Sequence, residues 1–205
     1  MVKSHKLHHE KDDYIANTQH ESLIKIIKTT PNTLRNLSLI VSCWLASNQS
    51  FTLFIFYIKY IPVSNVFLVG TAMGFACIGF LIMNYIIRRI GVMKAMKLSY
   101  FMVSVLITMV IATGSEANIM VYALLFFLLK MCVCMGYLTI FNAHLVLFDP
   151  RILATSYGIC GIFTSSTAML IPIYAELNNR QIPLIIILTL NVIATIACFF
   201  MRTIR

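Results

Sequence analysis

From Asn36 onward, the chain alternates long apolar segments with short polar breaks. We count six apolar segments, at roughly residues 36–58, 64–87, 95–113, 117–145, 152–175 and 183–201. Each is close to the ~20 residues that a helix needs to cross a bilayer. The breaks contain proline, glycine or charged residues, and because they are short, consecutive helices should lie antiparallel to one another. The pattern predicts an all-α polytopic membrane protein with six transmembrane helices over residues 36–205.

Residues 1–35 form a separate, polar N-terminal tail. No apolar h-region follows Met1, so the tail is not expected to be a secretory signal. Within the tail, residues 21–28 place isoleucine and leucine beside Lys25 and Lys28. This pattern predicts a short interfacial helix on the membrane surface, ending at Thr30-Pro31.

Composition agrees with a membrane protein. Of the 205 residues, 60% are hydrophobic and 11% are charged, whereas a soluble domain usually carries about a quarter charged residues. The mean hydropathy is +0.87. These values exclude a soluble enzyme, a disordered protein and a disulfide scaffold. The net charge of +9 does not indicate a nucleic-acid partner, because excess cations on so apolar a chain are typical of positive-inside topology.

The cations are distributed unevenly between the two ends of the predicted helices. One side holds only Lys59 and Arg180 in its loops. This asymmetry predicts that both termini lie on the cytoplasmic or matrix side and supports an even number of spans. The loops and tails of the cytoplasmic or matrix side hold Arg35, Arg88, Arg89, Lys94, Lys97, Arg151, Arg202 and Arg205.

Three stretches in this order resemble the C-terminal half of a major facilitator superfamily transporter, closest to the organic cation and anion carriers. Residues 30–35, before the first span, are similar to the TPxLR sequence of the family. Arg89-Ile90-Gly91 resembles the DRxGRR loop. Residues 148–151, followed by Ser156-Tyr157-Gly158 and later Pro172, resemble the ELxPTxxRxxGxG…P motif. The resemblance covers about residues 23–205 and implies a six-helix half of the transporter fold.

The chain also departs from that family. The cytoplasmic loop motif comprises Arg88, Arg89, Gly91 and Lys94, with Arg88 where the family has an acid. The acid of the third motif is absent, and its Pro–Arg spacing is compressed to Pro150-Arg151. In the family these charges form the latch between conformations, so their loss argues against gated transport.

Lys130 lies in the middle of the fourth segment, where a charge costs roughly 2.5–3.5 kcal/mol even on the lenient insertion scale. Many of the resembled carriers have a basic residue there. One interpretation is a counter-charge for a substrate anion. The other is a buried lysine satisfied by carbonyls, tyrosine, a lipid headgroup or a carboxylate of another chain. Cys134, Tyr137 and Phe141 follow at helical spacing and should share its face.

Two polar tetrapeptides interrupt the apolar segments. Ser47-Asn48-Gln49-Ser50 either lines a transport cavity, as the resemblance implies, or joins helices by hydrogen bonds. Thr164-Ser165-Ser166-Thr167 has the same two readings, and its hydroxyls can also bond to their own helix. His144 is interpreted as a satisfied histidine near a helix end. If the chain transports, the predicted substrate-binding residues are Lys130, Asn48, Gln49 and Tyr137.

Small residues predict where helices pack closely. Gly70 and Gly74 form a G-xxx-G pair in the second segment, and Gly158 and Gly161 lie on one face of the fifth. The sequence contains no Walker A motif, no nucleophile elbow and no metal-ligand spacing. We therefore expect no enzyme activity, no metal and no cofactor.

The resembled transporters bind substrate between two six-helix halves, and this chain supplies one wall of that cavity. It must then pair with another membrane protein chain, pair with itself, or not transport. The predicted function is a transporter-derived accessory or structural subunit of a larger membrane complex, with a respiratory complex of the mitochondrial inner membrane as one candidate host. The alternative is a half-transporter that moves a small organic ion with a partner half. A truncated gene model is a third explanation of the length.

Overall fold

The computed structural model describes residues 31–57, 70, 74–113, 119–176 and 181–201. Most of the N-terminal tail, the interfacial helix expected near 21–28 and most of residues 58–73 lie outside the described residues. The described ranges are helical, joined by turns. The helices are α3 (Pro31–Tyr57), α5 (Ile78–Ile90), α6 (Val92–Thr113), α7 (Ile119–Leu147), α8 (Pro150–Ala168), α9 (Ile171–Ala175) and α10 (Gln181–Phe200).

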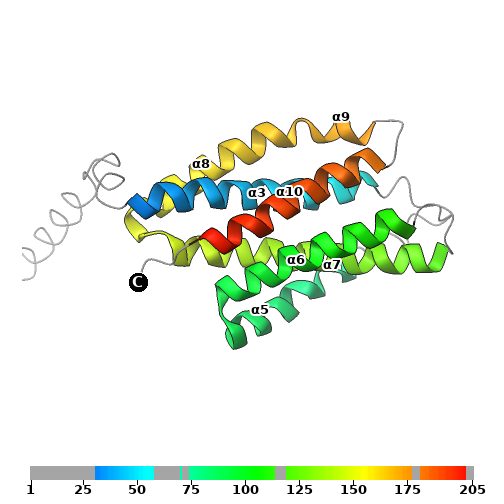
Figure 1. The fold of residues 1–205 in the computed structure, drawn as a ribbon, viewed down its shortest axis with the longest axis horizontal. Coiled ribbons are helices and arrows are strands. Elements are labelled where there is room, and N and C mark those ends of the chain that lie inside the picture. The colour runs from blue at the N-terminus through cyan, green and yellow to red at the C-terminus, as the bar shows by residue number, and fades with distance from the viewer. Residues whose placement is uncertain (1–30, 58–69, 71–73, 114–118, 177–180, 202–205) are drawn as a thin grey trace, which may run out of the picture.

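The helices run roughly along one long direction (Figure 1). In this view, α8 and α9 lie along one side, α3 and α10 through the middle, and α6, α7 and α5 along the opposite side. The beginning of α3 and the end of α10 lie at the same end of the bundle. α3 packs against α7, α8, α9 and α10, which makes it the central helix of this arrangement.

Local residue types explain where several helices begin and end. Pro31 opens α3, and proline suits the first helical position because its missing N–H needs no partner there. Residues 31–35, expected in the tail, therefore belong to α3. Asp149 caps α8 by accepting a hydrogen bond from the Arg151 N–H at 2.9 Å, with Pro150 next in sequence. Gly91, at φ 85°, separates α5 from α6 in a backbone conformation that favours glycine.

Four helices in the described ranges are long and apolar enough to cross a membrane. They are Val92–Thr113, Met120–Leu147, Pro150–Ile173 and Gln181–Phe200. They correspond to the four spans expected over 95–113, 117–145, 152–175 and 183–201. The other two expected spans, 36–58 and 64–87, are not among them. The protein is thus a helical membrane protein, with four candidate spans among its described residues.

The candidate spans differ in how much of each is covered by the rest of the chain. In the span of α7, 50% of the residues are buried, against 22% in the span that contains α8. α7 is also the longest described helix, with 29 residues, or about 43 Å at 1.5 Å per residue. This length exceeds the ~20 residues that a helix needs to cross a bilayer.

Close helix packing occurs at a glycine that the sequence patterns did not single out. A Cβ atom added at Gly79 in α5 would lie 2.6 Å from the backbone oxygen of Met131 in α7. At Gly158 and Gly161 such an atom would meet nothing within 4 Å, and both residues are exposed. Among the described residues, this glycine face therefore contacts no helix of the same chain. Gly70 and Gly74 are also exposed, with no described atom in reach.

Candidate functional site

The polar residues of α3 face its neighbouring helices and form hydrogen bonds across the bundle. Tyr100 of α6 donates its hydroxyl hydrogen to the carbonyl oxygen of Cys43 at 2.9 Å. The hydroxyl of Ser47 lies 2.7 Å from the Tyr100 oxygen. Since the Tyr100 hydrogen is already used, Ser47 donates to it. Ser47 and Tyr100 are both buried, so this chain of bonds joins α3 to α6 in the protein interior.

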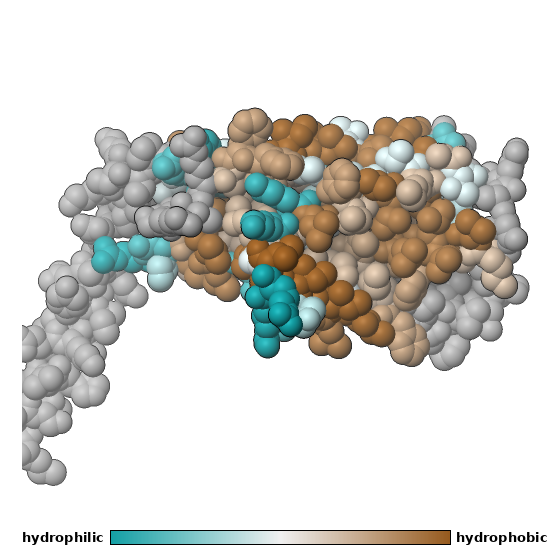
Figure 2. Space-filling model, turned by 60° about the horizontal axis from the view of Figure 1, so that its bottom comes forward, coloured by the Kyte–Doolittle hydropathy of each residue, from teal (hydrophilic) through white to brown (hydrophobic). Residues whose placement is uncertain are grey.

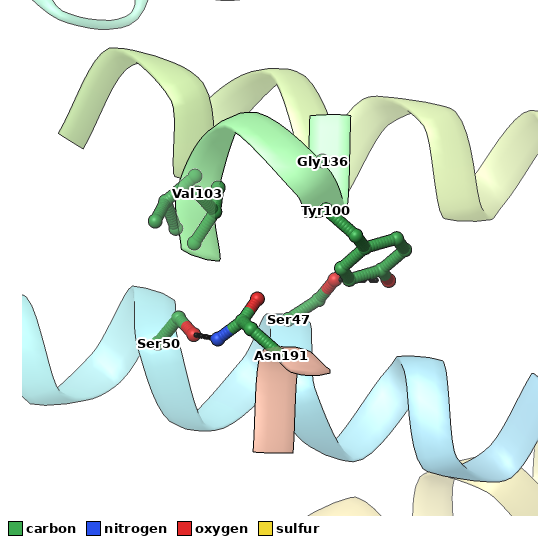
Figure 3. Close-up of a pocket in the computed structure, with 7 residues that line it drawn as sticks. Ser47, Ser50, Tyr100, Val103, Gly136 and Asn191 are labelled. Atoms are coloured by element: carbon green, nitrogen blue, oxygen red, sulfur yellow. Dashed lines mark hydrogen bonds between the residues drawn. The ribbon is translucent and has the colours of Figure 1, made fainter. Parts of the chain in front are cut away.

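A second cross-helix bond joins α3 to α10. The Asn191 amide nitrogen donates to the Ser50 hydroxyl and to the Ile187 carbonyl, both at 2.9 Å. Beside this pair lies a small cavity of about 10 Å³, whose lining also includes Ser47, Tyr100 and Gly136. Figure 3 shows the Asn191 nitrogen turned toward Ser50 and its oxygen toward α6, which carries Val103 and Tyr100. This volume is at the lower limit for one water molecule, far below that of an organic ion.

The predicted binding residues Asn48 and Gln49 lie in the same turn of α3. Asn48 is half-buried, and its amide nitrogen lies 3.4 Å from the carbonyl oxygen of Thr164 in α8. Gln49 is buried, with 6% of its surface exposed. Asn48 thus contributes to the contact between α3 and α8, and the tetrapeptide as a whole reaches three neighbouring helices.

His144 occupies a hydrogen-bonded position between α3, α7 and α8. The Trp44 indole N–H donates to Nδ1 of His144 at 3.2 Å. Nδ1 is therefore an acceptor, and Nε2 carries the hydrogen and donates to the Ser156 hydroxyl at 2.7 Å. Ser156 in turn donates to the Leu153 carbonyl at 2.8 Å. The geometry agrees with the predicted satisfied histidine, and it adds a role in joining three helices.

Aromatic rings continue from this histidine along α3, α7 and α8. The His144 ring stacks on Tyr157, with 3.9 Å between centroids. Trp44 meets Phe141 edge-on at 4.7 Å, and Phe141 lies 5.3 Å from Tyr137. The row reaches α3 again where Tyr137 lies 5.2 Å from Phe51.

Lys130 lies at the far end of this row. Its ammonium nitrogen is 3.7 Å from the centroid of the Phe51 ring and 3.4 Å from the Phe51 carbonyl oxygen. The side chain is buried, with 6% exposed. A ring face and a carbonyl both stabilise a cation. The predicted pair of Lys130 and Tyr137 thus comes together on Phe51, whereas Asn48 is bonded to α8 instead.

The second polar tetrapeptide behaves differently. The hydroxyls of Thr164, Ser166 and Thr167 each donate to a carbonyl one turn earlier in α8, at 2.8 to 3.1 Å. Ser165 and Ser166 are exposed. The reading in which these hydroxyls bond to their own helix is confirmed for Thr164, Ser166 and Thr167.

Sequence reasoning missed two residues that complete this site. Asn191 is an amide in the middle of the mainly apolar α10, which is itself a usable signal, because a polar amide deep in a span needs a partner. Tyr100 gave no such signal. Within the described ranges, no three His, Cys, Asp or Glu side chains converge so that they could hold a metal ion.

No protein family and no curated protein matches this sequence. The chain is therefore placed by its structure alone, as a helical membrane protein whose central helix is tied to its neighbours by buried polar side chains.

Proposed function

We propose that this protein is a structural subunit of a larger membrane complex, built as one six-helix half of a major facilitator-type fold and not itself moving a solute. The proposal rests on one observation: polar side chains of α3 are hydrogen-bonded to other helices of the same chain. Ser47 is bonded to Tyr100 and Ser50 to Asn191, both inside the chain. The cavity beside them has room for about one water molecule. Side chains committed to such bonds stiffen the bundle and are not available to a substrate.

In the proposed six-helix fold, α3 and the segment that ends in α5 also cross the membrane, in addition to the four candidate spans. An even number of spans agrees with the first and last described helices meeting at one end of the bundle (Figure 1). Arg35 at the beginning of α3 and Arg88 and Arg89 at the end of α5 lie at that end. We therefore propose that this end faces the cytoplasm or matrix.

The surface proposed to contact another membrane protein chain is the outer face of α8. This helix lies at the edge of the bundle, and its span is the least covered of the four. Gly158, Gly161 and Ser165 are exposed on it. Small residues on a lipid-facing helix let a second helix approach closely, so such faces are typical of contacts between membrane helices.

Native gel electrophoresis in mild detergent tests the proposal, using membranes that contain the full chain. We expect the protein to migrate with a complex far larger than itself, and Gly161→Leu to release it from that complex. Gly161 is exposed, and a Cβ atom added there meets nothing within 4 Å, so we expect the substitution to leave the chain folded. Ala112→Leu, on the exposed surface of α6, is the matched control and should leave the complex intact. Migration only as a monomer or dimer would rule out the subunit role.

A half-transporter is the second candidate, favoured by Lys130 and the aromatic row that leads to it. A buried cation over Phe51, beside Tyr137, has the chemistry to attract an organic anion. If this candidate holds, vesicles containing the chain and its partner half take up a radiolabelled organic ion, and Lys130→Gln stops uptake. Arg35→Gln, which removes an exposed cation at the beginning of α3, serves as the control. Uptake that is unchanged by Lys130→Gln would remove this lysine from the mechanism.

A further inference from the structure

The turn between α5 and α6 concentrates positive charge at one end of the bundle. Arg88 and Arg89 lie in the last turn of α5, and Lys94 and Lys97 follow in the first turns of α6. Only Gly91 separates the two helices, so the four cations are held close to one turn. The whole sequence has no aspartate or glutamate between Glu21 and Glu116.

Aromatic rings, and not carboxylates, support two of these cations. The Arg89 guanidinium lies 5.3 Å from the centroid of the Tyr85 ring, on its own helix. The Lys97 ammonium lies 4.7 Å from the Phe199 ring, at the end of α10. In the described part of the chain no carboxylate pairs with either residue. A ring contact leaves N–H donors that can still meet an anion.

Exposed apolar side chains lie next to these cations on both helices. On α5, Tyr85 and Leu81 precede Arg89 by one and two turns and are 60% and 72% exposed. On α6, Leu98 and Phe101 follow Lys94 and are 37% and 54% exposed. Residues spaced by three or four positions share one helix face, so each face is apolar with a cation at its end. Figure 2 shows groups of hydrophilic residues, most of them in its left half, on a mainly hydrophobic surface.

We propose that this surface binds an anionic phospholipid. Arg89, Lys94 and Lys97 would hold the phosphate, and the apolar residues of α5, α6 and α10 would contact the acyl chains. The charge of the cations and the exposed apolar surface beside them call for a ligand with both an anionic head and apolar tails. A free phosphate or an acidic soluble peptide matches the cations and leaves the apolar surface uncovered. The assignment does not depend on the proposed subunit role.

Native mass spectrometry of the full chain tests this assignment with lipids that differ only in their headgroup. The delipidated protein is titrated with phosphatidylglycerol and with phosphatidylcholine of identical acyl chains. A cation near a membrane surface strengthens the attraction to anionic lipid about fivefold. We expect phosphatidylglycerol to bind on the order of tenfold more tightly than phosphatidylcholine, and the double variant Arg89→Gln/Lys94→Gln to lose this preference.

The control is the double variant Arg35→Gln/Arg151→Gln, which removes the same charge at the same end of the bundle, from α3 and α8. It should keep the preference for phosphatidylglycerol. Equal losses in the two variants would show diffuse surface charge and overturn the proposal, as would equal binding of the two lipids. A third arm adds inorganic phosphate alone. If phosphate raises the thermal unfolding temperature as much as phosphatidylglycerol does, the ligand is a free anion and the lipid assignment fails.

Discussion

Two polar tetrapeptides, residues 47–50 in α3 and 164–167 in α8, use their hydroxyl groups differently in this protein. In α3, Ser47 and Ser50 reach side chains of other helices, at Tyr100 and Asn191. In α8, Ser166 and Thr167 bond back to carbonyls of their own helix. Both patterns satisfy the hydroxyl groups, but only the first joins separate parts of the chain.

The position of each helix explains the difference. α3 is surrounded by α7, α8, α9 and α10, so its polar side chains meet other helices on several sides. α8 lies at the edge, where its outer face meets no other described helix (Figure 1). A hydroxyl on such a face still needs a partner away from water, and the nearest acceptor is the carbonyl one turn earlier. Hydroxyl groups therefore join separate helices in α3, whereas those of Ser166 and Thr167 in α8 bond only within their own helix.

The largest effect is expected at His144 of α7, because its ring bonds to Trp44 of α3 and to Ser156 of α8. His144→Ala removes a buried ring and leaves the Trp44 indole N–H without its acceptor. We expect the free energy of unfolding to fall by about 3 kcal/mol. The measurement is a sodium dodecyl sulfate titration in mixed micelles, followed by circular dichroism. The matched control is Asn142→Ala on the same helix, since Asn142 bonds back to Leu138 in α7. Similar losses for both variants would contradict the joining role of His144.

Two glycines extend the comparison to packing. At Gly79→Ala the new Cβ would lie 2.6 Å from a backbone oxygen of α7, so α5 must shift. We expect a loss of about 1–2 kcal/mol. At Gly161→Ala the Cβ meets open space, and the better helix propensity of alanine should stabilise the isolated chain by about 0.5–1 kcal/mol. The same titration measures both variants. If both substitutions change the free energy of unfolding in the same direction, Gly79 and Gly161 do not differ in packing as described.

A smaller effect is expected at the bond between α3 and α10. Asn191→Ala removes the donor to Ser50 and should lower the free energy of unfolding by about 1 kcal/mol, a typical value for a polar contact between membrane helices. Thr189→Ala, on the same helix, removes a hydroxyl that only bonds back to Ile185 and provides the control. An unchanged titration midpoint for Asn191→Ala would show that this buried amide does not tie the two helices together.

The smallest effect compares the two tetrapeptides directly. Ser47→Ala removes a donor to Tyr100, and we expect a loss of about 0.6 kcal/mol. Ser166→Ala removes only a bond within α8, and we expect a change below about 0.3 kcal/mol, as for most exposed positions. Because the chemical change is identical, the difference between the two variants isolates the cross-helix contact. If Ser166→Ala costs as much as Ser47→Ala, the bond of Ser47 to α6 adds no more stability than a bond within one helix.

Part of the candidate site could be predicted from the sequence. Lys130 was singled out by its depth in an apolar segment, and Tyr137 by helical spacing on the same face. Their common contact, Phe51, lies 79 positions from Lys130 and carried no signal of its own. Gly79, the glycine that packs against α7, also carried no signal in the sequence. Gly79 belongs to no repeated small-residue pattern, whereas Gly158 and Gly161 do and yet face outward.

The sequence by itself determined the class of protein and the approximate limits of four helices, because hydropathy over about 20 residues and the capping of Asp149-Pro150 are local properties. It also determined the gathering of cations near helix ends. Only the tertiary structure decided which polar residue meets which. The bonded pairs Ser47–Tyr100 and Ser50–Asn191 are 53 and 141 positions apart, and their meeting depends on how whole helices pack around α3.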